Sequence, residues 1–110
     1  MSIVPAERPG TAALESDEVH DEPISDVRWR GLVRVEGRIR SMRVRPWAGE
    51  VRTLECTVVD DTGGIEIVFL GRSSINGLRL GTRLRAEGRV GAHHGRLAIL
   101  NPRYELRPAD

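Results

Sequence analysis

The sequence contains no lysine, so arginine is the only strongly basic side chain available to it, and all 17 basic residues are arginines. An arginine guanidinium forms planar, paired contacts with phosphate and stacks on nucleobases, whereas a lysine ammonium acts as a point charge. Because genome base composition also affects the choice between the two residues, the absence of lysine is only weak support for a phosphate-containing partner.

Cysteine and long apolar runs are also scarce. The single cysteine, Cys56, excludes an internal disulfide and fits a reducing compartment. No apolar run approaches the roughly 18 residues of a membrane-spanning helix. Residues 1–23 lack the basic segment and apolar core of a signal peptide. For this chain of 110 residues we therefore expect one soluble, cytoplasmic domain with no membrane partner.

Aromatic side chains are few, and each can be assigned an expected place. We expect Phe69 in the core, Tyr104 packed against the core after the last strand, and Trp29 at the start of the packed domain. Trp47 is different, because it lies in a glycine-containing loop next to several arginines. It is therefore the candidate for stacking on a base, with packing onto the end of the domain as the alternative.

Charge is distributed unevenly along the chain. Residues 1–27 contain seven acids and one arginine (net −6), whereas residues 28–110 contain sixteen arginines and nine acids (net +7). The first segment has no sustained apolar period, which predicts a disordered acidic tail before an ordered domain at 28–110. This asymmetry favours a polyanionic partner. The tail would either compete with that partner or simply increase solubility.

Five segments of the domain show the two-residue alternation of half-buried strands. Gly37, inside the first segment, predicts a bend that lets one strand serve both halves of a small barrel. Residues 71–81 predict a connector with at most one helical turn. Five short strands in about 75 residues favour an all-β, five-stranded barrel over a sandwich. The segments are 32–40, 53–59, 65–70, 83–90 and 96–100.

The stretch Asp60-Asp61-Thr62-Gly63-Gly64 joins the second and third segments. Paired acids beside paired glycines are compatible with a metal or phosphate site, but a strand follows where a phosphate loop needs a helix. Aspartate and glycine are also the residues that a short hairpin turn requires. We therefore predict a turn.

No catalytic or metal-binding constellation is evident. His93 and His94 are adjacent, and neighbouring residues of an extended strand point to opposite faces, so the sequence does not predict a zinc site. Cys56 alternates with the core residues of its strand and is expected to be a small buried hydrophobe. The sequence thus predicts no enzyme, no metal and no cofactor.

The strongest functional signal is an arginine cluster that leads to Trp47. Arginines neutralise phosphates, and an indole provides a stacking surface, which together are typical of proteins that bind single strands. Arg83, Arg85 and Arg89 of the fourth segment would widen the patch if they share its face. A solvated, charged strand face is the alternative. The cluster comprises Arg38, Arg40, Arg43, Arg45 and Arg52.

Four stretches, taken in order, resemble the OB (oligonucleotide/oligosaccharide-binding) fold: VRVEGRIRSMRVRP, LECTVVDDTGGIEIVFLG, LRLGTRLRAEGRV and GRLAILNPRYEL. More narrowly, they are similar to the wedge domain of RecG-type branch-migration helicases and to small stand-alone actinobacterial OB-fold proteins. The resemblance covers residues 32–107 and implies a five-stranded Greek-key barrel. It also implies contact with single-stranded or branched DNA through the Trp47 loop and the His93–His94 turn. The chain has no nucleotide-binding motif, so ATP-driven remodelling is not implied.

We therefore expect a non-enzymatic module that binds single-stranded or branched DNA with little sequence specificity, with RNA as an alternative ligand. The other hypothesis is a protein-interaction module. Glu55 and Glu66 favour it, because they place carboxylates on the outer face that usually binds nucleic acid. The candidate binding residues are Arg38, Arg40, Arg43, Arg45, Trp47, Arg52, His93, His94 and Arg96.

Overall fold

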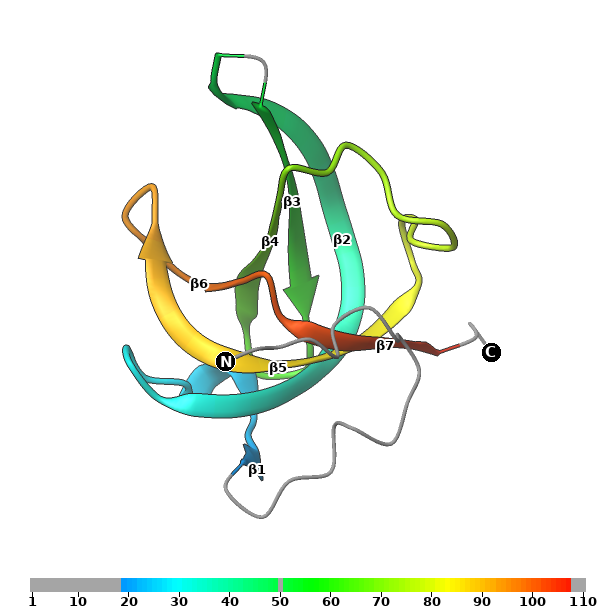
Figure 1. Ribbon diagram of the computed structural model, residues 1–110. Helices are drawn as coiled ribbons and strands as arrows, with labels where there is room; N and C mark the ends of the chain where they lie inside the picture. Colours follow the sequence, from blue (N-terminus) through cyan, green and yellow to red (C-terminus); the bar gives the residue numbers. More distant parts are fainter. Residues whose placement is uncertain (1–18, 50, 108–110) are drawn as a thin grey trace.

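Strands dominate the computed structural model, as the two-residue alternation predicts (Figure 1). The structure describes residues 19–49 and 51–107, apart from the side chains of Trp47 and Ala48. None of the helical segments in these ranges is long and apolar enough to cross a membrane. In chain order the elements are β1 (His20–Asp21), the 3-10 helix η3 (Ile24–Asp26), β2 (Leu32–Ala48), β3 (Val51–Val59), β4 (Gly64–Leu70), β5 (Arg83–His93), β6 (Arg96–Leu100) and β7 (Arg103–Arg107).

The strand pairings form a ring. β2 pairs with β3, β3 with β4, β4 with β6, β6 with β5, and β5 again with β2. All of these pairings are antiparallel except β4 with β6. We call these five strands the ring. The all-β prediction is confirmed, but the prediction of five strands is corrected to seven, because β1 adds to β2 and β7 adds to β5. Both extra strands are short, and short segments give little alternation to recognise.

The inner face of the ring carries the apolar residues that alternation predicts. Leu54, Cys56 and Val58 of β3 are buried, as are Ile65, Ile67 and Phe69 of β4. Tyr104 of β7 meets the ring of Phe69 edge-on, with 5.4 Å between centroids, as expected of a residue packed on the core. Residues 71–82 form turns without a helix.

The long strand β2 serves both halves of the ring. Residues 32–38 pair with β5, and the strand pairs with β3 from Arg38 onward. It changes partner at Gly37 and Arg38, in agreement with the bend predicted at the glycine. The strand also continues to Ala48, so the backbone of Trp47 belongs to β2 and not to the loop that was expected there.

A bulge at Arg40 then changes the face on which the side chains of β2 lie. Ile39 pairs with Val58 and Ser41 pairs with Thr57, so Arg40 has no counterpart on β3. A bulged residue shifts the alternation of a strand by one. Before the bulge the odd-numbered residues point inward. After it Met42 packs against the core, and Arg43 turns to the outer face.

The segment before β2 is packed, in contrast to the flexible tail predicted for residues 1–27. Val19, Ile24 and Val27 are buried, and β1 adds to β2 in parallel. The division at residue 28 therefore needs correction, because the ordered unit already includes residues 19–27. Trp29, expected to mark its start, is exposed, and the guanidinium of Arg30 lies 4.4 Å from its ring centroid. Residues 1–18 of the predicted tail lie outside the described residues.

The Asp60 stretch is the turn between β3 and β4, as predicted. One oxygen of Asp60, Oδ1, accepts hydrogen bonds from the backbone N–H of Thr62 (2.7 Å), the backbone N–H of Gly63 (3.1 Å) and the Thr62 hydroxyl (2.6 Å). The other, Oδ2, accepts from the backbone N–H of Ile24 at 2.9 Å. Asp60 thus holds the turn and ties η3 to it. Burial would raise the pKa of Asp60, but the hydrogen bonds from Thr62, Ile24 and Gly63 outweigh it and keep the pKa below its ordinary value.

We expect Asp60→Asn to lower the free energy of unfolding by about 1–2 kcal/mol at neutral pH, because charge-assisted hydrogen bonds become neutral ones. The folded-state pKa is lower than the unfolded one, so the carboxylate stabilises the fold above pH ~4 and loses this effect as the pH falls through the folded value. Urea denaturation of the wild type and of Asp60→Asn at several pH values across this range measures the difference in the free energy of unfolding. Asp61→Asn, exposed and adjacent, should have almost no effect. A wild-type advantage that does not vary with pH would contradict the assignment.

Candidate functional site

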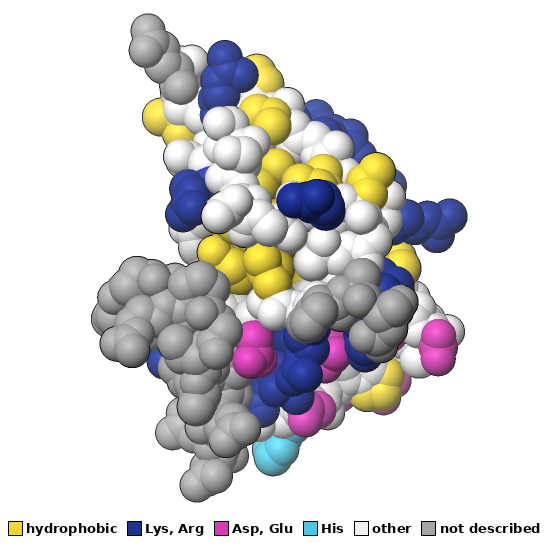
Figure 2. Space-filling model, turned by 90° about the vertical axis from the view of Figure 1, so that its right-hand side faces the viewer, with side chains coloured by type: hydrophobic (Ala, Val, Ile, Leu, Met, Phe, Trp, Pro, Cys, Tyr) yellow, Lys and Arg dark blue, Asp and Glu magenta, His cyan; other side chains and the backbone are white. Residues whose placement is uncertain are grey.

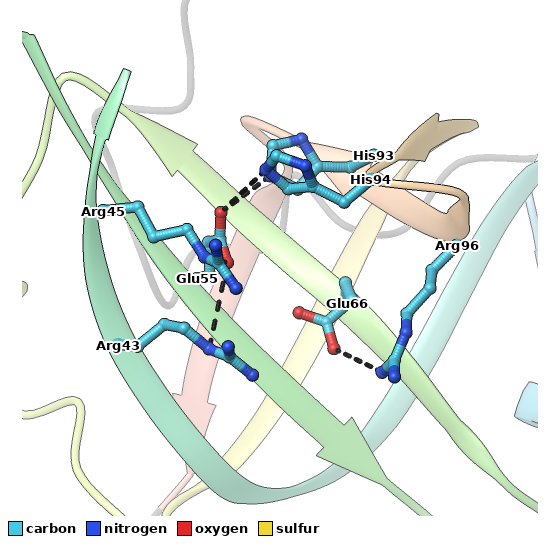
Figure 3. A pocket seen from close by; sticks show the side chains of 7 residues that line it. All are labelled: Arg43, Arg45, Glu55, Glu66, His93, His94 and Arg96. Atoms are coloured by element: carbon cyan, nitrogen blue, oxygen red, sulfur yellow. Dashed lines mark hydrogen bonds and ion pairs between the residues drawn. The ribbon is translucent and has the colours of Figure 1, made fainter.

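A pocket of about 200 Å³ lies on the outer side of the ring (Figure 3). Every ring strand, together with the turn between β5 and β6, contributes to its lining. The residues come from parts of the chain up to 53 positions apart, as Arg43 and Arg96 show. The lining consists of Arg43, Arg45, Glu55, Glu66, His93, His94 and Arg96.

Glu55 is at the centre of this pocket. Its Oε1 accepts a hydrogen bond from Nε of Arg45 at 2.8 Å and lies 4.0 Å from Nε of Arg43. Its Oε2 lies 2.7 Å from Nε2 of His93 and 3.8 Å from Nε2 of His94. Burial would raise the pKa of Glu55, but the hydrogen bond with His93 and the positive charge of Arg45 outweigh it and keep the pKa below its ordinary value. Glu55 is therefore an ionised carboxylate with four cationic or titratable neighbours.

His93 and His94 lie on the same side of the chain, so the expectation that they point to opposite faces is wrong. His93 is the last residue of β5, whereas His94 and Gly95 form a two-residue turn with φ of 53° and 78°. Positive φ at both central residues matches the twist of a β-hairpin. Because the backbone turns at His94, its ring packs edge-on against that of His93 with 4.2 Å between centroids.

Glu66 is the second carboxylate of the pocket. Its Oε2 accepts a hydrogen bond from the Thr57 hydroxyl at 2.7 Å and lies 3.8 Å from NH1 of Arg96. Glu55 and Glu66 were expected to oppose a polyanionic ligand. In the structure each is already engaged by cations, so three arginines and two carboxylates leave one excess positive charge.

The guanidinium groups of the pocket remain accessible. The side chains of Arg43, Arg45 and Arg96 are 51%, 42% and 72% exposed. The bond from Arg45 to Glu55 uses Nε, which leaves the terminal N–H groups for another acceptor. The pocket can thus bind phosphate oxygens through these groups while Glu55, at its centre, stays paired with Arg45.

Five of the nine candidate residues meet in this pocket, whereas Arg38, Arg40 and Arg52 do not line it. Arg38 lines a different cavity beside Asp60 and donates to the carbonyl of Gly81 at 3.1 Å. Arg40 is exposed at the bulge, and Arg52 lines a cavity near the tip of the β2–β3 hairpin. The side chain of Trp47 lies outside the described residues, so its stacking role stays a prediction.

Arg83, Arg85 and Arg89 of β5 do not line this pocket, and Arg89 donates to the carbonyl of Arg30 at 2.8 Å. Arg83 and Arg85 lie 3.1 and 3.7 Å from oxygens of Glu36 on β2, and Arg85 also contacts Glu105 of β7. The register explains these ion pairs, because Glu36 and Glu105 are both opposite Arg85. On the lower half of the face shown in Figure 2, acidic side chains lie directly beside basic ones.

Cys56 is fully buried next to this site, on the inner face of β3. Burial and the neighbouring charge of Glu66 raise the pKa of its thiol to about 12. The thiol is therefore protonated at neutral pH and is a poor nucleophile, which agrees with its predicted role in the core.

Comparison with protein families gives one match. Residues 33–107 match the family model described as OB-fold nucleic acid binding domain. No curated protein matches the chain. The matched segment begins in β2, ends with β7 and contains every residue of the pocket. Because it covers more than half of the chain, the protein belongs to the family of OB-fold nucleic acid binding domains.

Proposed function

We propose that the protein is a non-enzymatic module that binds single-stranded or branched DNA with little sequence specificity. The observation that carries the proposal is the set of accessible guanidinium groups of Arg43, Arg45 and Arg96 around one pocket of an OB-fold domain. Contacts of this kind neutralise the phosphate backbone, which is common to all sequences.

The geometry supports backbone contacts more than base recognition. The carboxylates of the pocket, Glu55 and Glu66, already accept hydrogen bonds from the protein. They therefore have little acceptor capacity left for discrimination between bases. The preference for branched DNA rests only on the resemblance of the four sequence stretches to the RecG-type wedge domain, and RNA is the alternative ligand to be compared directly.

We expect Arg43→Gln/Arg45→Gln to weaken binding to single-stranded DNA at least about tenfold, because each charged hydrogen bond contributes about 1.5–3 kcal/mol. The slope of log affinity against log salt should fall by about 1.4, or about 0.7 for each lost phosphate contact. Fluorescence anisotropy with labelled single-stranded, double-stranded and forked DNA and single-stranded RNA, at two salt concentrations, measures both.

The matched control is Arg79→Gln/Arg89→Gln, which removes the same charge from exposed positions outside the pocket. It should change affinity only slightly. Equal losses in the two double variants would indicate non-specific attraction to a basic protein. No binding of any nucleic acid by the wild type would favour the alternative, a protein-interaction module built on the same ring.

A further inference from the structure

Glu55, His93 and His94 bring three potential metal ligands together at one end of the pocket (Figure 3). Each residue offers one ligand atom, and the three atoms lie within 4.8 Å of one another. Oε2 of Glu55 is the oxygen that faces Nε2 of both histidines. Glu55 and His93 are buried, with side chains 4% and 7% exposed. Such burial fixes the positions of two ligands before an ion arrives.

We propose that Glu55, His93 and His94 bind one divalent transition-metal ion of the Zn²⁺ and Co²⁺ class. This goes beyond the proposed function and does not depend on it. The distances from Oε2 to the two imidazole nitrogens are 2.7 and 3.8 Å. Ligands of a tetrahedral zinc ion with bonds of about 2.0–2.1 Å lie about 3.3 Å apart, between these two values. Shifts of about half an ångström would bring Oε2 of Glu55 to this distance from each of the two imidazole nitrogens.

The two oxygens of Glu55 have separate neighbours, which suits a metal ligand. Oε2 faces the histidines, whereas Oε1 is bound by Arg45 and lies near Arg43. A ligating carboxylate is normally held by hydrogen bonds from an outer shell. Arg45 would supply that contact without occupying the ligand oxygen.

The composition of the site selects the kind of ion. Mg²⁺ and Ca²⁺ require several oxygen ligands. This site instead offers two imidazoles and one carboxylate, and Arg43 and Arg45 partly neutralise the charge of that carboxylate. Such a ligand set suits ions that bind nitrogen strongly. Three protein ligands leave a fourth position toward the open pocket, where the side chain of His94 is 61% exposed. The arginines would favour an anion or hydroxide at that position.

The test is titration of the full chain with Co²⁺ and with Zn²⁺ in the absence of nucleic acid. We expect one Co²⁺ per chain, with the visible absorption of a low-coordinate ion, and displacement by Zn²⁺ in calorimetry. His94→Gln should weaken binding more than about 100-fold, since loss of a mere outer-shell partner costs about 10- to 100-fold. Because His94 is exposed, this variant should remain folded, which circular dichroism verifies.

His20→Gln is the matched control, since His20 is the remaining histidine and lies on β1 outside the pocket. It should leave metal binding unchanged. Absence of a stoichiometric cobalt complex, or equal binding by wild type and His94→Gln, would overturn the proposal. Because this assay contains no DNA, its failure would leave the nucleic-acid measurement unaffected, and the reverse also holds.

Discussion

Gly37→Ala is expected to lower the free energy of unfolding by about 3 kcal/mol or more, or to prevent folding. A Cβ atom at Gly37 would lie 2.3 Å from the backbone oxygen of Val59 and 2.9 Å from a methyl carbon of Val58. The first contact is with backbone inside a paired strand, so it cannot be relieved by rotation of a side chain. Either β2 or β3 has to move, and Gly37 is where β2 passes between its two partners.

Thermal and urea denaturation measure this effect. Gly63→Ala is the control, because a Cβ at Gly63 would have no atom closer than 3.8 Å. That variant should stay within about 0.5 kcal/mol of the wild type. A Gly37→Ala protein as stable as Gly63→Ala would mean that β2 and β3 do not approach each other as closely as the structure has them.

Glu55→Gln should destabilise the fold and strengthen nucleic-acid binding at the same time. Loss of one partner of a fully buried ion pair costs about 3–5 kcal/mol. The guanidinium of Arg45 is about half exposed, so we expect a cost of about 2 kcal/mol here. The pocket then has one less negative charge and its arginines are released toward phosphate. We expect tighter binding to single-stranded DNA, with a steeper salt dependence.

Denaturation and anisotropy on the same samples separate the two effects. Glu105→Gln makes the same substitution at a carboxylate that also contacts two arginines, Arg85 and Arg107, but is more exposed and lies outside the pocket. It should cost less than about 1 kcal/mol and leave the salt slope unchanged. Weaker binding by Glu55→Gln would mean that Glu55 mainly positions the arginines.

Local pattern alone determined much of this fold. Alternation of apolar residues identified the inner faces of β3 and β4, although outer-face residues such as Glu55 and Val68 are buried as well. The Asp60 turn was predictable because aspartate and glycine favour turns through bonds to their own nearby backbone. The basic character of the domain likewise depends only on composition. Each of these features is decided by residues within a few positions of one another.

The site was decided by tertiary structure. Arg38 and Arg43 are close in sequence and were predicted to act together, but they line different cavities, because β2 changes partner at Arg38 and continues along β3. Glu55 and His93 are 38 positions apart, and only closure of the ring brings them within 2.7 Å. The sequence determined which strands and turns form. Their pairing, which depends on contacts between distant residues, decided which charges meet, and so placed Glu55 and Glu66, two carboxylates expected to oppose a polyanion, in ion pairs with the arginines that would bind it.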